Sequence, residues 1–301
     1  MLWQSLIGAK SAAAAPKQQY IAIASEASPF VLAYPWSSSG FGTKFANPAT
    51  LPTGYAFGVA FSPAGDAIAV GHTTAPYVTA YSWSSSGFGT KFADPTTTPS
   101  TQGRKIDFNP SGDVIAIAHL ATPYISAYPW SSSGFGAKFA NPATLPTSAS
   151  YGVAFSPAGD YIAVCYSVGG ARVSVYPWSS SGFGTKFADP TTIPTGPGYG
   201  VAFRPTGDAI AIAHNVSPYI SAYPWSSSGF GTKFTNPATL PAGTGYDVAF
   251  NPTGSAIAVA HATTPYITAY PWSSSGFGTK FTNPSIGLAG PAGNSVTFTE
   301  I

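Results

Sequence analysis

Short apolar runs of strand length recur along the chain, separated by turn residues. In the segment 198–240, large and small residues alternate at 199–203, residues 209–214 (AIAIAH) are apolar on both faces, and a third run covers 219–223. Alternation with period two is typical of a strand, and a run that is apolar on both faces is typical of a strand buried on both faces. Residues 230–234 (FGTKF) predict a fourth strand, and helical periodicity is absent from the repeats.

Turn chemistry separates these predicted strands. Pro205 and Gly207 predict a tight turn, because Pro fixes φ and Gly tolerates a positive φ. We expect Pro224 and Trp225 to end the third strand and the Ser-rich residues 226–229 to form a hairpin. The NPATLP segment after the fourth strand contains two prolines, so it predicts a connection rather than a continued ladder.

The whole pattern recurs six times. The phrase WSSSGFGTKF, with Ala137 replacing Thr in the third copy, begins at tryptophans spaced 47, 47, 48, 47 and 47 residues apart: Trp36, Trp83, Trp130, Trp178, Trp225 and Trp272. One such unit cannot bury its own sheet faces, so the units must stack or form a ring. Four short strands per unit predict an all-β fold, a six-bladed β-propeller of four-stranded antiparallel blades. An open solenoid is the alternative.

The ends of the repeat region predict that the ring closes. Residues 19–24 match the second strand of a unit, and residues 295–298 match the first strand. The two fragments add to one blade, whereas an open array would leave two apolar sheet faces exposed. We therefore expect a C-terminal strand to complete the N-terminal blade, with the propeller at 19–301 and an N-terminal arm at 1–18.

The predicted arm has an apolar stripe of its own. Leu2, Trp3, Leu6 and Ile7 fall on one side of a short helix, so we expect them to dock on a partner subunit or on the propeller itself. No basic region precedes this short apolar stretch, which favours a retained arm that acts as an anchor over a cleaved signal peptide.

Three features resemble known propeller repeats. VAF followed by a Pro-x-Gly turn, at 201–207, resembles the first strand of WD repeats, and PYITAY at 265–270 resembles the third strand of YVTN-type propellers of surface proteins. The unit YPWSSSGFGTKFANPATLPTG resembles repeats of tailed-bacteriophage virion proteins. The resemblance covers residues 20–299, but no Trp-Asp or Gly-His pair starts or ends a blade, so the hydrogen-bond network of WD repeats is not carried over.

Charge and composition narrow the classes of partner. Only 7% of the residues are charged and the net charge is +2, without a basic stripe, so we expect no nucleic-acid partner. No stretch approaches the roughly 20 apolar residues of a membrane helix, so we expect no membrane span. Cys165 is the single cysteine and forms no intramolecular disulfide.

Three repeated residue types invite a functional interpretation, but a structural role is favoured for each. Four histidines end the second strands of their units, and we expect each to hydrogen-bond a loop within its own blade rather than to share a metal site: His72, His119, His214 and His261. Six lysines fall in the predicted outermost strand, where edge protection is favoured over anion binding: Lys44, Lys91, Lys138, Lys186, Lys233 and Lys280. The repeat tryptophans are expected to pack between blades rather than to stack on sugars.

Two sets of residues depart from the repeat and are the candidate sites. Lys105, Asp107 and Asp247 replace small residues of the first strands, so they predict a polar cluster in the channel that holds an ion or polar ligand or forms a satisfied network. We call top the propeller face that the second-to-third loops and the fourth-to-first loops share. The second set lies at the predicted rim of this face: Phe57, Arg104, Tyr151, Tyr199 and Tyr246, with Arg172 in a nearby loop. Aromatic residues with Arg on a concave rim favour an interaction surface, the alternative being a lid over the core.

No arrangement of residues supports catalysis or a bound cofactor, so we expect a protein that acts by binding. The resemblance implies a non-enzymatic structural or adhesive component of a bacteriophage virion, such as a tail, fibre or capsid-surface protein. Its expected partners are other virion or surface proteins, or a glycan, with several copies in one assembly. The alternative is a secreted, extracellular bacterial propeller that is lectin-like or binds proteins.

Overall fold

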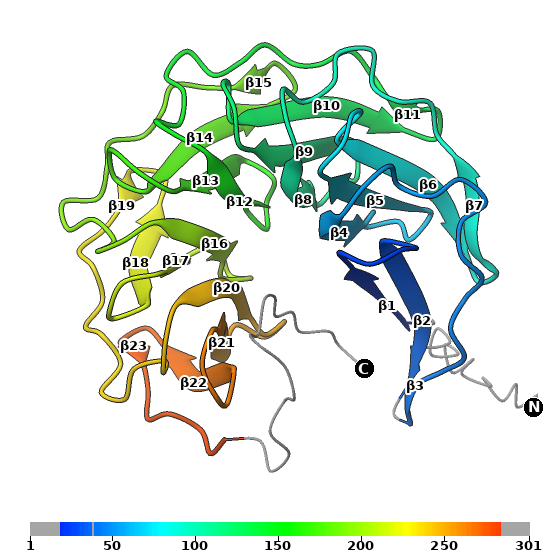
Figure 1. The fold of residues 1–301 in the computed structure, drawn as a ribbon. Coiled ribbons are helices and arrows are strands. Elements are labelled where there is room, and N and C mark those ends of the chain that lie inside the picture. Colours follow the sequence, from blue (N-terminus) through cyan, green and yellow to red (C-terminus); the bar gives the residue numbers. More distant parts are fainter. Residues whose placement is uncertain (1–18, 38, 284–301) are drawn as a thin grey trace, which may run out of the picture.

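The fold is a six-bladed β-propeller, as the repeat predicts. The computed structural model describes residues 19–37 and 39–283, and every helix or strand assigned in these residues is a strand. Six antiparallel sheets surround a central channel (Figure 1). We number the blades 1 to 6 along the chain. The predicted closing strand at 295–298 and the predicted arm at 1–18 lie outside the described residues.

Each blade is a simple meander in which sequence neighbours pair. Blades 1 to 3 consist of β1 (Gln19–Ala24), β2 (Val31–Ser37), β3 (Gly40–Phe41); β4 (Ala56–Phe61), β5 (Ala67–His72), β6 (Val78–Ser84), β7 (Gly87–Lys91); β8 (Gly103–Phe108), β9 (Val114–His119), β10 (Ile125–Ser131), β11 (Gly134–Phe135). Blades 4 to 6 consist of β12 (Ser150–Phe155), β13 (Tyr161–Tyr166), β14 (Val173–Ser179), β15 (Gly182–Phe183); β16 (Gly198–Phe203), β17 (Ala209–His214), β18 (Ile220–Ser226), β19 (Gly229–Phe230); β20 (Gly245–Phe250), β21 (Ala256–His261), β22 (Ile267–Ser273), β23 (Gly276–Phe277).

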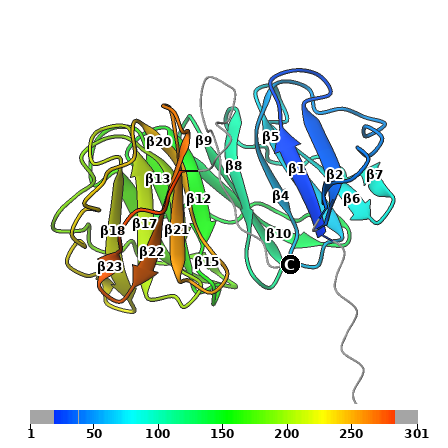
Figure 2. The ribbon, with the colours of Figure 1, turned by 90° about the horizontal axis from the view of Figure 1, so that it is seen from below.

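The blades stand side by side with their strands running along the channel axis (Figure 2). In blades 2 to 6 the first strand lies toward the channel and the fourth lies at the periphery (Figure 1). Blade 1 has three strands among the described residues, and β1 is their inner edge.

The fourth strand is shorter than predicted in five blades, and a proline explains why. β18 continues through Pro224 and Trp225 to Ser226, whereas β19 covers only Gly229 and Phe230. The Pro224 carbonyl accepts a hydrogen bond from Gly231 N, so this face of Pro224 points toward the fourth strand, where the missing proline N–H leaves no donor.

Blade 2 is a natural control for this explanation. Ser82 replaces the proline there, and the fourth strand β7 extends over five residues, Gly87–Lys91. A lysine was expected on every fourth strand. Only Lys91 of blade 2 lies on one, because the fourth strands of the other blades cover two residues and end before the lysine.

The core consists of five apolar layers, one at each junction between blades 1 to 6. The alternating AIAIAH pattern gives each blade a face of small residues and a face of large ones. At the junction of blades 5 and 6, Ala209 and Ala211 of the small face pack with Ile257, Tyr270 and Trp272 of the large face. The same pairing of faces recurs at the other junctions, so neighbouring blades interlock in one direction around the ring.

A tryptophan organises each of these layers. The ring of Trp178 makes edge contacts with Phe155 and Phe183 of its own blade and with Phe139 of the preceding one, at centroid distances of 5.4, 4.9 and 5.1 Å. The indole side chains in blades 2 to 6 are between 4% and 8% exposed. The prediction that the tryptophans pack between blades is therefore confirmed in these five.

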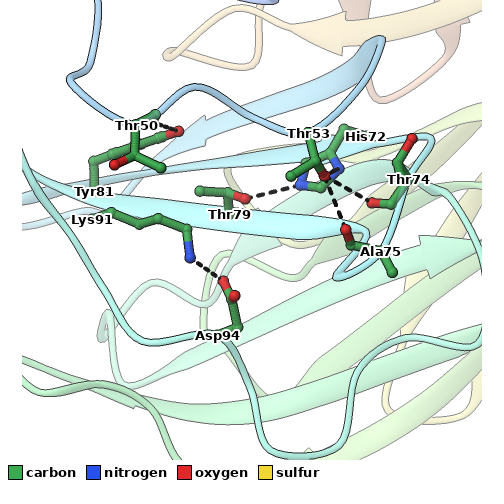
Figure 3. Close-up of polar contacts among 9 residues, drawn as sticks. All are labelled: Thr50, Thr53, His72, Thr74, Ala75, Thr79, Tyr81, Lys91 and Asp94. Atoms are coloured by element: carbon green, nitrogen blue, oxygen red, sulfur yellow. Dashed lines mark hydrogen bonds and ion pairs between the residues drawn. The ribbon is translucent and has the colours of Figure 1, made fainter.

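A buried tyrosine ties each of blades 2 to 6 to the connection that precedes it. The hydroxyl of Tyr81 donates a hydrogen bond to the carbonyl of Thr50 over 2.7 Å (Figure 3). Four equivalent bonds of 2.7 to 2.8 Å follow in the later blades: Tyr128 to Thr97, Tyr176 to Thr144, Tyr223 to Thr192, and Tyr270 to Thr239.

Candidate binding site at the mouth of the channel

The five predicted rim residues occupy one structural position. Each is the second residue of an inner strand: Phe57 of β4, Arg104 of β8, Tyr151 of β12, Tyr199 of β16 and Tyr246 of β20. The register with the second strand shifts at this residue in all five blades, as it does at a β-bulge. A bulge redirects a side chain from the regular ladder, and here the redirected residue is Phe in one blade, Arg in the next and Tyr in the other three.

The five side chains form a continuous arc in which each group contacts the next. The Arg104 guanidinium lies 4.0 Å from the centre of the Phe57 ring and 5.4 Å from that of Tyr151. Tyr151 meets Tyr199 edge to face at 5.1 Å, and Tyr199 lies tilted against Tyr246 at 5.8 Å. The structure therefore brings together side chains from five successive blades.

These side chains line a cavity of about 400 Å³ with Ala24, Glu26 and Ala56. Glu26, in the loop between β1 and β2, was missed from the sequence because the predicted rim residues came only from first strands. Its position just after the 19–24 strand pattern was the available signal, since second-to-third loops belong to the top face. Arg172 does not line this cavity; its guanidinium donates a hydrogen bond to the carbonyl of Ser167 over 2.9 Å.

Among residues 19–37 and 39–283, the lining of the mouth includes one cation, Arg104, and one carboxylate, Glu26. Burial lowers the pKa of Arg104, and the nearby Tyr151 and Glu26 act in the opposite direction. The Arg104 Nε atom is buried and has no hydrogen-bond partner among the described residues. Burial also raises the pKa of Tyr199 above its ordinary value.

The predicted polar cluster lies deeper in the channel, in a cavity of about 530 Å³ lined by the inner strands. Lys105 Nζ of blade 3 pairs with Asp247 Oδ2 of blade 6 over 2.8 Å, with the Asp247 side chain 6% exposed. Asp107 makes a separate contact, because its Oδ2 accepts a hydrogen bond from Phe155 N over 2.8 Å. The three residues thus line one channel, but only Lys105 and Asp247 form an ion pair across it. Asp107 instead links two neighbouring blades.

Burial perturbs the proton affinities of this cluster. Burial raises the pKa of Asp107 to about 7, although the Phe155 amide and Lys105 act to lower it. Burial also acts to lower the pKa of Lys105, but the charge and hydrogen bond of Asp247 outweigh it and raise that pKa. Lys105 therefore stays charged through its ion pair, whereas Asp107 titrates near neutral pH.

The four histidines hydrogen-bond within their own blades, as predicted, but the Nε2 partner lies on the third strand and not in the predicted loop. His72 Nε2 lies 2.9 Å from the hydroxyl of Thr79 in the same blade, and its Nδ1 lies 3.4 Å from Thr53 (Figure 3). His119, His214 and His261 make the equivalent bond to Ser126, Ser221 and Thr268 over 2.9 to 3.1 Å. Within residues 19–37 and 39–283, no group of three His, Cys, Asp or Glu side chains is arranged to hold a metal ion.

The lysines contact nearby acceptors. Lys91 pairs with Asp94 (Figure 3), and Lys44, Lys138, Lys186, Lys233 and Lys280 likewise contact Asn47, Asn141, Asp189, Asn236 and Asn283. Each contact joins residues three positions apart, so these cations are engaged locally rather than directed outward as a ring.

The predicted anchor residues Leu2, Trp3, Leu6 and Ile7 lie outside the described residues. Among the residues that are described, no helix is long and apolar enough to cross a membrane. No known protein family matches the sequence. No curated protein matches it either.

Proposed function

We propose that this chain is a non-enzymatic binding propeller that serves as a structural or adhesive component of a bacteriophage virion. It acts through the mouth of its channel by binding a host surface or another protein. The arc from Phe57 to Tyr246 is the observation that carries the binding role, because five blades bring four aromatic side chains and one arginine together at one bulged position. The virion assignment is supported by the resemblance of the repeats and by the low charge of the chain.

Localisation tests the virion assignment. Mass spectrometry of purified phage particles should detect peptides of this chain at constant ratio to the major structural proteins. A chain found only free in bacterial culture medium would overturn the virion assignment and favour a secreted lectin-like or protein-binding propeller, for which the aromatic mouth is equally suited.

Adhesion to the host surface tests the binding role separately. We expect the purified chain to bind host cells, and the variants Tyr199→Leu and Tyr246→Leu to bind them roughly tenfold less tightly, as truncation of central aromatic contacts does in other interfaces. Lys44→Ala and Lys233→Ala serve as controls at the periphery. Loss of binding in the lysine variants alone would place the binding surface at the outer edge.

A further inference from the structure

We infer that the mouth binds a terminal sugar unit that carries a carboxylate. This inference rests on the proposed binding function and specifies its ligand. It starts from Arg104, the one cation among the described residues that line the mouth cavity.

Arg104 is held in place but not neutralised by an ion pair. The guanidinium carbon lies 4.0 Å from the centre of the Phe57 ring and 5.4 Å from the centre of the Tyr151 ring. The described residues form four ion pairs, and none of them includes Arg104. Aromatic contacts use the face of a guanidinium and leave its N–H edge for planar acceptors. A carboxylate fits that edge in a bidentate geometry.

The charge balance of the mouth favours a single negative charge on the ligand. Glu26 lines the same cavity, so the formal charge of Arg104 and Glu26 together is zero. A phosphate monoester, with a charge of about −1.5 to −2 at pH 7, would meet this carboxylate with no second cation among the described lining residues to offset it. A monoanion can bind Arg104 while its hydroxyl groups donate hydrogen bonds to Glu26.

The shape and lining of the cavity favour the end of a glycan. All six blades contribute to its lining, which makes it a bowl on the channel axis of about 400 Å³. Tyr151, Tyr199 and Tyr246 line it from three neighbouring blades, and each combines an apolar ring with a polar hydroxyl, which suits the C–H faces and hydroxyl groups of a sugar. Peptide carboxylates are typically captured by backbone N–H groups, whereas the cation of this mouth is a side chain set among aromatic rings.

A glycan array that carries each acidic glycan beside its methyl ester tests the inference, because the ester keeps the shape and removes the charge. The full chain should bind glycans that end in a uronic or nonulosonic acid and bind their esters roughly tenfold or more weakly. Arg104→Lys keeps the charge but loses the planar fork, so it should lose a similar factor. Arg204→Met is the matched control, because Arg204 pairs with Asp208 in the turn after β16, away from the mouth.

The outcomes separate this inference from the proposed function. One outcome is that acids and esters bind equally and that binding is lost in Tyr199→Leu but not in Arg104→Lys. This result would overturn recognition of the carboxylate and leave a mouth that binds neutral glycans. Binding only to peptides with free carboxyl ends would overturn the assignment of a sugar as the ligand. No binding to any acidic glycan, together with adhesion to host cells that needs Tyr199, would overturn the ligand class but leave the binding function. Thermal melts of each variant check that the propeller remains folded.

Discussion

Asp107 shows how one departure from the repeat changes the chemistry of the channel. Most blades carry a small residue at this point of the inner strand, as in Ala154 and Ala202, whereas Asp107 places a carboxylate against the backbone of the next blade. Its pKa lies near 7 instead of the ordinary 3.8, because burial disfavours the charged form. The folded protein therefore holds a proton that the unfolded chain releases, and this difference makes its stability depend on pH.

The variant Asp107→Asn should remove this pH dependence. A raised pKa favours the folded state at low pH, and that advantage is lost as the pH rises from about 3.8 to about 7. The wild-type protein should therefore lose stability relative to the variant between about pH 5 and about pH 8, by on the order of 2 kcal/mol, since the carboxylate lines a cavity that admits water. Urea unfolding of both proteins at the two pH values measures the difference.

The comparison isolates Asp107 because the histidines are the same in both proteins. Burial lowers the pKa values of His72, His119 and His214 to about 4, so they act in the opposite direction and would mask the effect in the wild type alone. A constant difference between the two proteins across this range would show that Asp107 is ionised throughout.

The length of the fourth strand depends on one backbone N–H. The variant Pro224→Ala restores the donor that Ser82 provides in blade 2, so β19 should extend beyond Phe230 toward five residues. The new amide at residue 224 should be protected from hydrogen exchange, whereas Gly231 N, which already donates to the residue 224 carbonyl, should change little. Pro224→Ser is the companion variant: extension with Ser but not Ala would assign the effect to a hydroxyl, since the Ser82 hydroxyl lies 3.4 Å from the Thr90 carbonyl.

The tryptophan at each junction should contribute more to stability than its repeat sequence alone implies. Trp178 is 8% exposed among three Phe rings, so Trp178→Leu should lower the free energy of unfolding by about 3 kcal/mol. Trp36 has the same local sequence but is only half-buried in blade 1, so Trp36→Leu should cost less. Equal losses in urea unfolding would mean that the tryptophan acts within its blade rather than between blades.

The sequence predicted the strands more accurately than the contacts between side chains. The second strand of blade 5 was predicted at 209–214 and is found there, because period-two alternation and turn residues act locally. The extension of the third strand past Pro224 was missed, since it depends on which side of the sheet the proline faces. The rim residues were identified by their variation, but their stacked arc and Glu26 depend on how six blades converge.

At the scale of the whole molecule, the direction of blade packing leaves two complementary faces. Blade 1 presents its large face with Ile21, Ile23 and Tyr34 only partly buried, and Ile23 is 39% exposed, whereas the equivalent residues Ile212 and Tyr223 are fully buried. Blade 6 presents its small face with Ala269 partly buried. Each face matches the partner that it has at the other five junctions, so the fold itself favours closure between blades 6 and 1.

Removing residues 294–301 should therefore abolish cooperative folding. The segment 295–298 carries the pattern of an inner strand, and β1 is the inner edge of blade 1 among the described residues, so the sequence predicts that the two pair. Without that strand, the apolar faces of blades 1 and 6 would lose the element that aligns them. Thermal unfolding followed by circular dichroism should change from one sharp transition to a broad one. Deleting residues 1–15 is the matched control, because the predicted arm is expected to leave the propeller folded. A chain without 294–301 that melts like the intact protein would contradict closure by the C-terminal strand.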